Sequence, residues 1–420
     1  MEREELSAWL RLTLTPGVGN GIARKLLAAF GLPAAIFAQP VSALAQVAGQ
    51  SLAASLRTEP LDLALQLDRT WNWLNGAGEN GAGANGAGHR HILALGDMGY
   101  PESLLNIADP PLMLYLLGAA SLEKNTPAAS VEHIKSDINI VANCLVTSAA
   151  QSVAIVGSRN PTPQGLANAR HFARALAQAG LTVVSGMALG VDGAAHAGAL
   201  EGFDGAAGLQ TGGQGGSRLA TIAVVGTGLD RVYPKSHRDL AHAIAQNGLI
   251  ISEYPLGTPP LAANFPKRNR IIAALAQGTL VVEAALKSGS LITASLAAEM
   301  GKEVFAIPGS IHSTQSRGCH ALIRQGAKLV ESAQDVLEDM KIEGAAISVA
   351  DAADDAGASS TNDAENTLLS ALGFDPVSLD ALQARTGIDT PSLQAQLMGL
   401  ELQGLVARLP GGLFQRLAQA

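Results

Sequence analysis

The sequence predicts an α/β protein whose centre is an extended Rossmann-like, doubly wound and mostly parallel sheet. Two observations lead to this fold class. From residue 152 onward, six short apolar runs rich in β-branched residues alternate with stretches of helical pattern. This alternation is typical of a parallel sheet with helices on both faces. Polar segments rich in glycine and serine also follow most of the runs, at the position where open α/β sheets bind ligands.

The six predicted strands have the length and composition of buried parallel strands. Each is a short segment dominated by apolar, often β-branched, side chains, which suit a strand that is covered on both faces. The predicted strands are 153–156, 181–184, 222–225, 249–251, 279–282 and 304–307. The helices that separate them are expected chiefly at 164–179, 236–246, 268–276 and 291–300.

An N-terminal helical domain of the helix-hairpin-helix, or SAM-like, type is expected over residues 1–74. Its segment 14–23 resembles the turn of a helix-hairpin-helix, with Gly17-Val18-Gly19 between two helical patterns. Backbone N–H groups in such a turn can contact phosphates without reading sequence, but a packing role is favoured here. Residues 75–90 are largely a low-complexity run of Gly, Ala and Asn, which predicts a flexible linker.

The predicted core spans residues 91–343 and is followed by a second flanking domain. Two segments of the core, near 120–150 and 202–218, are polar or rich in glycine and are expected to be surface insertions. Residues 344–364 form an acidic linker of small residues. Residues 365–420 then show short helical patterns and a hairpin-like end, which together predict a winged helix.

Composition excludes several classes of protein. Of the 420 residues, 47% are hydrophobic and 15% are charged, as in soluble globular chains. No apolar run approaches the ~20 residues that a membrane-spanning helix needs, and the acidic residues at the N-terminus are unlike a signal peptide. A cytoplasmic protein without membrane contact is therefore expected. Cys144, Cys319 and the nine histidines form no metal-binding pattern, so neither a metal nor another cofactor is expected.

The net charge of −8 is distributed unevenly along the chain. Residues 151–330 contain 15 basic and 9 acidic residues, a net charge of +6, whereas the remaining 13 basic and 27 acidic residues give −14. A basic segment within an acidic chain concentrates positive potential where a polyanion can be steered. The core is thus the part of the chain suited to a polyanion, provided that its cations converge in space.

Glycines, serines and cations gather where the predicted strands end. Glycine and serine let backbone amides approach phosphates closely, and arginine presents donors that match phosphate oxygens. Because the carboxyl ends of parallel strands share one edge, these residues are expected to line a groove that follows a phosphate backbone. The predicted phosphate-binding residues are Gly157, Ser158, Arg159, Ser185, Gly186, Lys235, Lys267, Arg268, Asn269, Arg270, Lys287, Ser288, Gly289, Ser290 and Arg317.

Three of these cations occur within four consecutive residues, 267–270, directly after a proline. Pro266 cannot lie deep inside a helix, so we expect a helix to begin near Lys267. The positive end of the helix dipole is unfavourable for Lys267, Arg268 and Arg270 unless an anion lies among them. A phosphate would supply that anion. On this interpretation, loss of Arg268 and Arg270 weakens binding and leaves the stability of the fold nearly unchanged.

The sequence contains fragments of catalytic patterns but no complete one. The Gly-Thr-Gly segment 226–228 follows a predicted strand and lacks the third glycine of a dinucleotide-binding motif. Asp192 and His196 are one helical turn apart without a third metal ligand, so a hydrogen-bonding role is expected. Glu283 ends a predicted strand without a nucleophile or a second carboxylate. We therefore expect a binding protein rather than an enzyme, with no catalytic residue.

Taken together and in order, the motifs of the core resemble those of the bacterial DNA-processing protein A family, known as DprA or Smf. The resemblance covers most of the chain apart from the three low-complexity or polar insertions. It rests on the segments 100–101, 109–111, 154–159, 185–196, 222–230, 233–234, 252–255, 265–272, 282–284, 288–294 and 308–309.

The family resemblance implies an extended Rossmann-like core that binds single-stranded DNA and forms a homodimer. It also implies protection of incoming DNA and loading of the RecA recombinase during natural transformation. By motif, the DNA-contacting residues would be Arg159, Lys235, Arg268 and Arg270, with 288–290 as a phosphate cradle. The dimer and RecA surfaces cannot be located from the sequence, nor can the role of the winged helix or the transformability of the host.

Two other functions remain open. One is a Rossmann-like nucleotide-hydrolysing enzyme of the lysine-decarboxylase-like group. The Pro-Gly-Gly-x-Gly-Thr loop of that group does not occur here, and residues 287–290 occupy the comparable place. The other is a sequence-specific regulator that acts through the winged helix. The expected recognition region, 392–402, contains no Lys or Arg, so protein contacts are favoured there over duplex binding.

Overall fold

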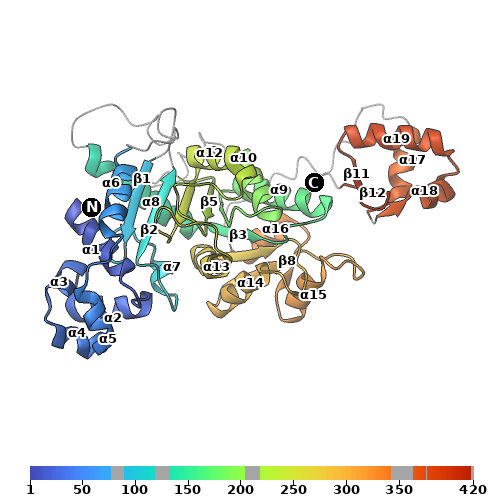
Figure 1. The fold of residues 1–420 in the computed structure, drawn as a ribbon. Coiled ribbons are helices and arrows are strands. Elements are labelled where there is room, and N and C mark those ends of the chain that lie inside the picture. Colours follow the sequence, from blue (N-terminus) through green and yellow to red (C-terminus); the bar gives the residue numbers. More distant parts are fainter. Residues whose placement is uncertain (77–88, 119–132, 204–217, 342–362, 375, 418–420) are drawn as a thin grey trace.

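The computed structural model describes residues 1–76, 89–118, 133–203, 218–341, 363–374 and 376–417. In these residues, a nine-stranded sheet with helices on both faces forms the centre of the molecule (Figure 1). A three-stranded sheet belongs to the C-terminal segment. The predicted linker 75–90, the insertion 202–218 and the linker 344–364 lie mostly outside the described residues.

The large sheet has the strand order β1-β2-β6-β5-β4-β3-β7-β8-β9. Strands β3 to β9 are parallel, whereas β2 runs antiparallel to β6 and β1 antiparallel to β2. The bounds are β1 His89–Ala94, β2 Met113–Gly118, β3 Ser152–Val156, β4 Thr182–Ser185, β5 Thr221–Val224, β6 Leu249–Ser252, β7 Gly278–Val281, β8 Glu303–Ala306 and β9 Lys328–Leu329. This topology confirms the predicted doubly wound, mostly parallel sheet.

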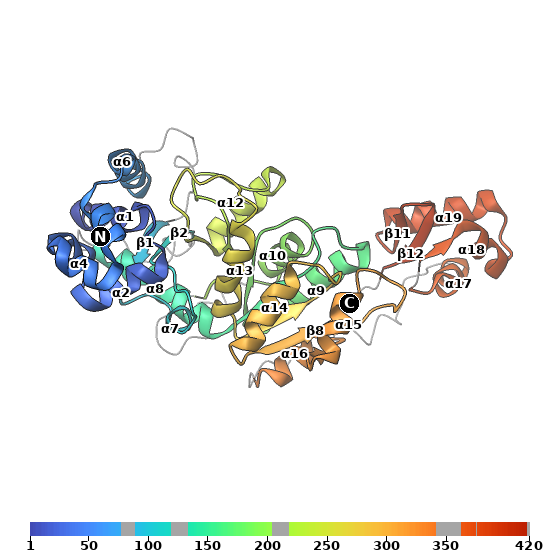
Figure 2. The same cartoon turned by 60° about the horizontal axis from the view of Figure 1, so that its bottom comes forward.

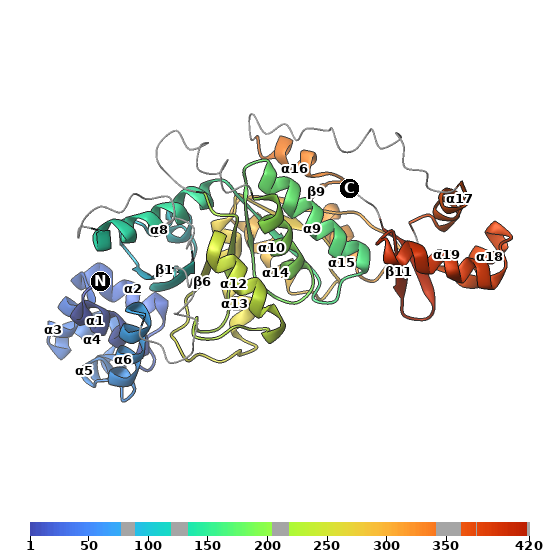
Figure 3. The ribbon, with the colours of Figure 1, turned by 90° about the horizontal axis from the view of Figure 1, so that it is seen from above.

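Alternate residues of each parallel strand face two different layers of helices. In β3, Val153 and Ile155 pack in the layer of α9 and α10, whereas Ala154 and Val156 pack in the layer of α13 and α14. The first layer contains α9 Pro163–Gln178, α10 Val191–Gly202, α12 Arg238–Asn247 and α16 Ala333–Asp339 (Figure 3). The second contains α7 Glu102–Leu105, α8 His133–Ala150, α13 Asn264–Leu275, α14 Ser290–Glu299 and α15 Arg317–Arg324 (Figure 2).

Six helices precede the sheet and share a core with its β1–β2 end. They are α1 Arg3–Leu14, α2 Asn20–Phe30, α3 Pro33–Ala38, α4 Val41–Ala48, α5 Gln50–Arg57 and α6 Leu63–Leu74. Trp9 and Leu26 are buried in the same apolar cluster as Tyr115 of β2. Gly17 lies between α1 and α2 with a φ of 83°, a conformation that favours glycine. The N-terminal helices therefore cover one end of the sheet.

The segment 120–150 differs from the expected surface insertion. From His133 onward it forms α8, and Val141, Leu145 and Ala149 are buried against the large sheet. The prediction was wrong because it was based on the polar residues at the start of the segment and overlooked the apolar residues of the helix that follows. Residues 119–132 lie outside the described part of the chain.

The C-terminal segment has the predicted winged-helix fold. It consists of α17 Asp363–Leu372, β10 Val377–Ser378, α18 Leu379–Thr386, α19 Thr390–Leu402, β11 Val406–Leu409 and β12 Leu413–Arg416. Leu382, Leu397 and Phe414 lie in a core of its own. Two of its helices begin at side-chain caps, because Ser378 accepts a hydrogen bond from Ala381 N and Asp389 accepts one from Ser392 N. The described part of this segment therefore confirms the winged helix of the predicted fold class.

Candidate nucleic-acid interface

The loops that follow the parallel strands meet at the carboxyl edge of the sheet. The chain leaves β3 toward β4, β5 and β6 on one side and later places β7, β8 and β9 on the other, so the order reverses beside β3. Open α/β sheets bind ligands at such a reversal. Two contacts join segments of this edge, one between two loops and one between helix α13 and the loop after β7. Gln315 donates to the carbonyl oxygen of Asn160 at 3.1 Å, and Asn269 donates to that of Gly289 at 3.3 Å.

Five of the predicted cations are exposed: Arg159, Lys235, Lys267, Lys287 and Arg317. They follow β3, β5, β6, β7 and β8 respectively, and the carboxyl ends of these strands face the same edge. Exposed cations on separate loops can each contact a different phosphate of an extended chain. These five side chains therefore lie on a surface that a polyanion can reach.

An aromatic pair lies beside one of these cations, Arg159, and was absent from the predicted site. The Arg159 guanidinium lies 5.4 Å from the centroid of the Phe265 ring, and the rings of Phe265 and Tyr233 are 5.6 Å apart. Tyr233 is 46% exposed, so a planar group can reach it. The available sequence signal was an aromatic residue before Pro234 and another before Pro266, each next to a cation.

The loop after β3 is held in place by Glu283 at the end of β7. The carboxylate of Glu283 accepts hydrogen bonds from Thr162 N at 2.9 Å and Thr162 Oγ1 at 2.5 Å. Thr162 in turn caps α9 by accepting a hydrogen bond from Gly165 N at 3.0 Å. Burial raises the pKa of Glu283, and the hydrogen bonds from Thr162 oppose that shift. Glu283 therefore braces the loop that carries Arg159.

Most of the predicted glycine and serine contacts lie beneath the surface of the edge. Ser185 is buried and its hydroxyl donates to Ile155 O at 2.6 Å. Ser158 is also buried, and its hydroxyl accepts from Asn160 N at 3.1 Å. A side chain at Gly157 would collide with Val191 of α10. The two serine hydroxyls thus bond within the protein, and a contact of these residues with phosphate stays a prediction.

The predicted cradle 288–290 lies between β7 and α14. The hydroxyl groups of Ser288 and Ser290 are 2.6 Å apart, and Ser290 N donates to Ser288 Oγ at 3.3 Å. Ser290 is buried, whereas Gly289 is exposed. This turn contacts the first part of α13 through Asn269. Its role as a phosphate cradle stays a prediction.

Arg268 is buried, contrary to the expectation that it faces a bound phosphate. Only 3% of the residue is exposed, and its Nη1 donates to the carbonyl oxygen of Val224 at the end of β5. It lies against Gly186, where any side chain would overlap the guanidinium. Burial lowers the pKa of Arg268 to about 10, and the nearby Asp192 carboxylate opposes that shift. Arg268 therefore joins α13 to the ends of β4 and β5.

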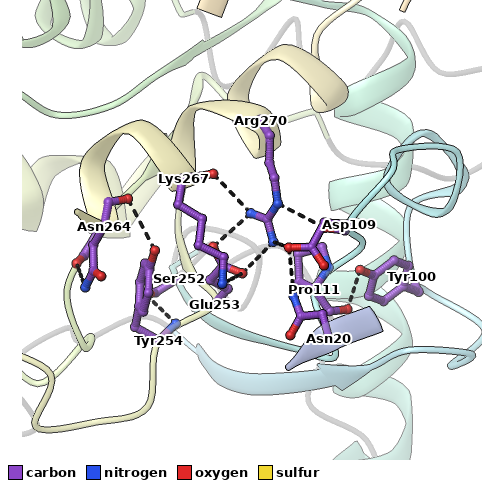
Figure 4. A network of polar contacts seen from close by, with 11 residues as sticks. Asn20, Tyr100, Asp109, Pro111, Ser252, Glu253, Tyr254, Asn264, Lys267 and Arg270 are labelled. Carbon is purple, nitrogen blue, oxygen red and sulfur yellow. Dashed lines mark hydrogen bonds and ion pairs between the residues drawn. The ribbon is translucent and has the colours of Figure 1, made fainter. Parts of the chain in front are cut away.

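Arg270 is also buried and is held in a network of carboxylates and carbonyl groups (Figure 4). Its Nη1 and Nη2 donate to the two oxygens of Glu253 at 2.8 and 2.6 Å, and its Nε donates to Asp109 O at 2.9 Å. Nη2 also lies 3.4 Å from Asp109 Oδ2. The predicted direct contact of Arg270 with phosphate therefore conflicts with its geometry, because protein oxygens already occupy its donors.

Helix α13 begins at Asn264, three residues before the predicted start. Pro266 lies within the first turn, where its missing N–H leaves no hydrogen bond unmade. Asn264 donates to Gly226 O at 3.0 Å and fixes this start to the loop after β5. The anion that the cations require is supplied within the protein, since Glu253 and Asp109 lie beside Arg270. In place of the predicted phosphate, two carboxylates of the protein lie beside Arg270.

Metal and membrane binding find no support in the described residues. Among them, no group of three or more His, Cys, Asp or Glu side chains is placed to hold a metal ion. No helix in the same part of the chain is long and apolar enough to cross a membrane. His196 is buried, with Nδ1 2.7 Å from Thr221 Oγ1, and burial lowers its pKa to about 3.

The fold and this edge define a Rossmann-like protein with a cationic carboxyl edge and a C-terminal winged helix. The family model described as DNA recombination-mediator protein A matches residues 141–341, and the DprA winged helix domain matches 352–412. The chain belongs to the DprA/Smf family.

Two curated relatives illustrate this membership. Protein Smf of Escherichia coli (strain K12) is 41% identical over 275 residues, which cover 64% of this chain and 68% of that protein. DNA processing protein DprA of Streptococcus pneumoniae is 42% identical over 242 residues, which cover 58% of this chain and 71% of that protein. The X-ray structure of DprA from Streptococcus pneumoniae aligns with a TM-score of 0.57 and 32% identity, covering 81% of this chain and 98% of that chain.

Proposed function

We propose that this protein binds single-stranded DNA along the carboxyl edge of its sheet. The observation that carries the proposal is that five exposed cations follow strands ending at one edge of the sheet, where Arg159 lies beside the aromatic pair Phe265–Tyr233. Cations that follow a backbone and aromatic rings that stack with bases are the two components of general single-strand binding. Each stacked base contributes roughly 1–3 kcal/mol.

The same geometry favours a single strand over a duplex. In a duplex the faces of the bases are already stacked on one another, so rings such as Phe265 and Tyr233 gain contacts mainly with unpaired bases. Helix α19 of the winged helix, where a duplex-reading domain would carry its cations, contains no Lys or Arg. Relatives carry the name DNA processing protein, which supports DNA as the ligand.

In the cell, we propose a role as a recombination mediator during natural transformation. The protein would protect incoming single strands and load the RecA recombinase onto them, as a cytoplasmic homodimer. The matched family description, DNA recombination-mediator protein A, supports this role. We propose no catalytic activity. Glu283, the residue considered as a general base, accepts two hydrogen bonds from Thr162 and so has a structural role.

The proposal is tested by fluorescence anisotropy with a labelled oligonucleotide, single-stranded or annealed to its complement. We expect the single strand to bind much more tightly than the blunt duplex, with little dependence on base sequence. Equal affinities would contradict the proposed ligand. The recombination step needs a second assay, in which this protein should accelerate assembly of RecA filaments on DNA coated with a single-strand-binding protein. An unchanged assembly rate would contradict the loading step alone.

A further inference from the structure

Two carboxylates, Glu253 and Asp109, contact Arg270 of α13, and one of them, Glu253, also lies near the exposed Lys267. The side chain of Glu253 is 6% exposed and that of Asp109 is 37% exposed. Arg270 contacts both of them (Figure 4). A single arginine thus compensates two negative charges at the edge that is proposed to receive phosphates.

Lys267 shares one of these carboxylates. Its Nζ lies 4.0 Å from Glu253 Oε2, the oxygen that Arg270 Nη2 contacts at 2.6 Å. Arg270 Nη1 also donates to the carbonyl oxygen of Lys267 at 3.2 Å. The short bidentate pair satisfies Glu253, while the longer contact leaves the half-exposed Lys267 ammonium only weakly held.

We propose that Arg270 is a positioning residue of the single-strand site: it neutralises Glu253 and Asp109 and thereby keeps Lys267 available to phosphate. This inference rests on the proposed binding of single-stranded DNA. Without the arginine, Glu253 draws Lys267 into a closer ion pair, so that ammonium group is lost to the phosphates, and Asp109 is left without a cation and repels the phosphate backbone. The buried arginine thus acts on DNA through Lys267 and through charge.

The N-terminal hairpin supports the outer part of this arrangement. Asn20, the first residue of α2, donates to Asp109 Oδ2 at 3.3 Å, and Arg24 donates to Ala108 O at 2.7 Å. These contacts fix the loop whose carbonyl and carboxylate groups hold Arg270. The hairpin therefore has a packing role here, and it fixes one of the two carboxylates that Arg270 neutralises.

A double-mutant cycle separates this role from direct contact between Arg270 and DNA. The variants are Arg270→Gln, Glu253→Gln and the pair combined, with single-strand affinity and thermal stability measured for each. We expect Arg270→Gln to bind roughly tenfold more weakly, because close charges couple by factors of a few to about a hundred. We expect the double variant to bind within about threefold of Glu253→Gln, because the carboxylate that draws Lys267 away is gone and the remaining one, Asp109, is 37% exposed and screened by solvent.

The salt dependence and a matched control sharpen the test. Loss of Lys267 from the site should reduce the salt slope of Arg270→Gln by about 0.7, the contribution of one phosphate, and Glu253→Gln should restore it. The control combines Glu253→Gln with Arg159→Ala, since Arg159 is exposed and contacts Phe265 rather than Glu253. Glu253→Gln should give no specific rescue in that background.

Each outcome decides the inference. A double variant much weaker than Glu253→Gln alone would show that Arg270 does not act through Glu253 and Lys267, and an Arg270→Gln variant with unchanged affinity would show that Arg270 does not act on binding. Either result overturns the proposal. If Arg270→Gln fails to fold, the affinities of the double variant and of Glu253→Gln can still be compared, and that comparison decides whether Arg270 acts through Glu253. A wild-type protein that binds no single-stranded DNA contradicts the proposed function instead.

Discussion

At the scale of single residues, exposed and buried arginines of the edge should respond in opposite ways to substitution. Arg159→Ala should weaken binding to single-stranded DNA and reduce the salt slope by about 0.7, because one phosphate contact is lost. The melting temperature should change little, since the side chain is exposed. Arg174→Ala, an exposed arginine toward the C-terminal end of α9, is the control and should leave affinity unchanged. If both variants lost affinity equally, binding would depend on the overall charge of the protein rather than on the cations of this edge.

Arg268→Ala should instead destabilise the fold. The substitution removes the donor to Val224 O and the charge near Asp192, and it leaves a cavity beside Gly186. We expect a loss of about 3 kcal/mol or more in the free energy of unfolding. Denaturant unfolding monitored by circular dichroism measures it. A variant as stable as the wild type would restore the original interpretation, in which Arg268 serves a ligand.

The sequence revealed the charges of this region but not their partners. Arg268 and Arg270 are two positions apart on α13 and therefore point in different directions from the helix axis. Their partners come from distant segments: Arg270 meets Glu253, 17 positions away, and Asp109, 161 positions away. The exposed cations could be predicted without knowing any distant partner. Arg159 was placed at the edge because a positive charge directly follows a predicted strand.

At the scale of secondary-structure elements, α9 and α10 approach each other closely because of two glycines. A Cβ at Gly198 would overlap the carbonyl of Arg170, and one at Gly202 would overlap that of Arg174. Gly198→Ala should therefore push the helices apart and cost about 1–3 kcal/mol of stability. Binding of single-stranded DNA by the folded fraction should be retained, since α10 contributes no exposed cation. Unchanged denaturant stability would contradict this account of the packing.

The predicted elements are most accurate where a buried element appears in the sequence as an apolar run. The six predicted strands match β3 to β8 within one residue at each end, because parallel strands covered on both faces appear as uninterrupted apolar runs. Strand β1 was missed because it starts with His89-Arg90-His91, which has no apolar run. Helix α13 was placed with a late start because its first turn is held by contacts with distant loops, through Asn264.

At the scale of the whole molecule, the proposed binding edge and the winged helix are separable. All exposed cations of the edge lie between Arg159 and Arg317, and the winged helix has its own core. Two of its arginines lie over its own aromatic rings, Arg408 over Phe414 and Arg416 over Phe374. Removal of residues 344–420 should leave a folded protein that binds single-stranded DNA within about threefold of the full chain, because every exposed cation of the edge is retained.

Anisotropy and thermal melting of the truncated protein check this expectation. A protein that remains folded and loses most of its affinity would place the winged helix within the binding site. That result would also require a different source of cations, because this segment carries only Arg385, Arg408 and Arg416. The salt slope of the truncated protein should match that of the full chain.

The central claim is that a row of cations at the carboxyl edge follows the phosphates of a single strand. Its most direct test is the affinity for a single-stranded oligonucleotide measured across a range of salt concentrations. About four to six neutralised phosphates predict a slope of log K against log[salt] of roughly −3 to −4, at about −0.7 per phosphate. A slope near zero would contradict the account, because it would mean that these cations do not contact the phosphate backbone.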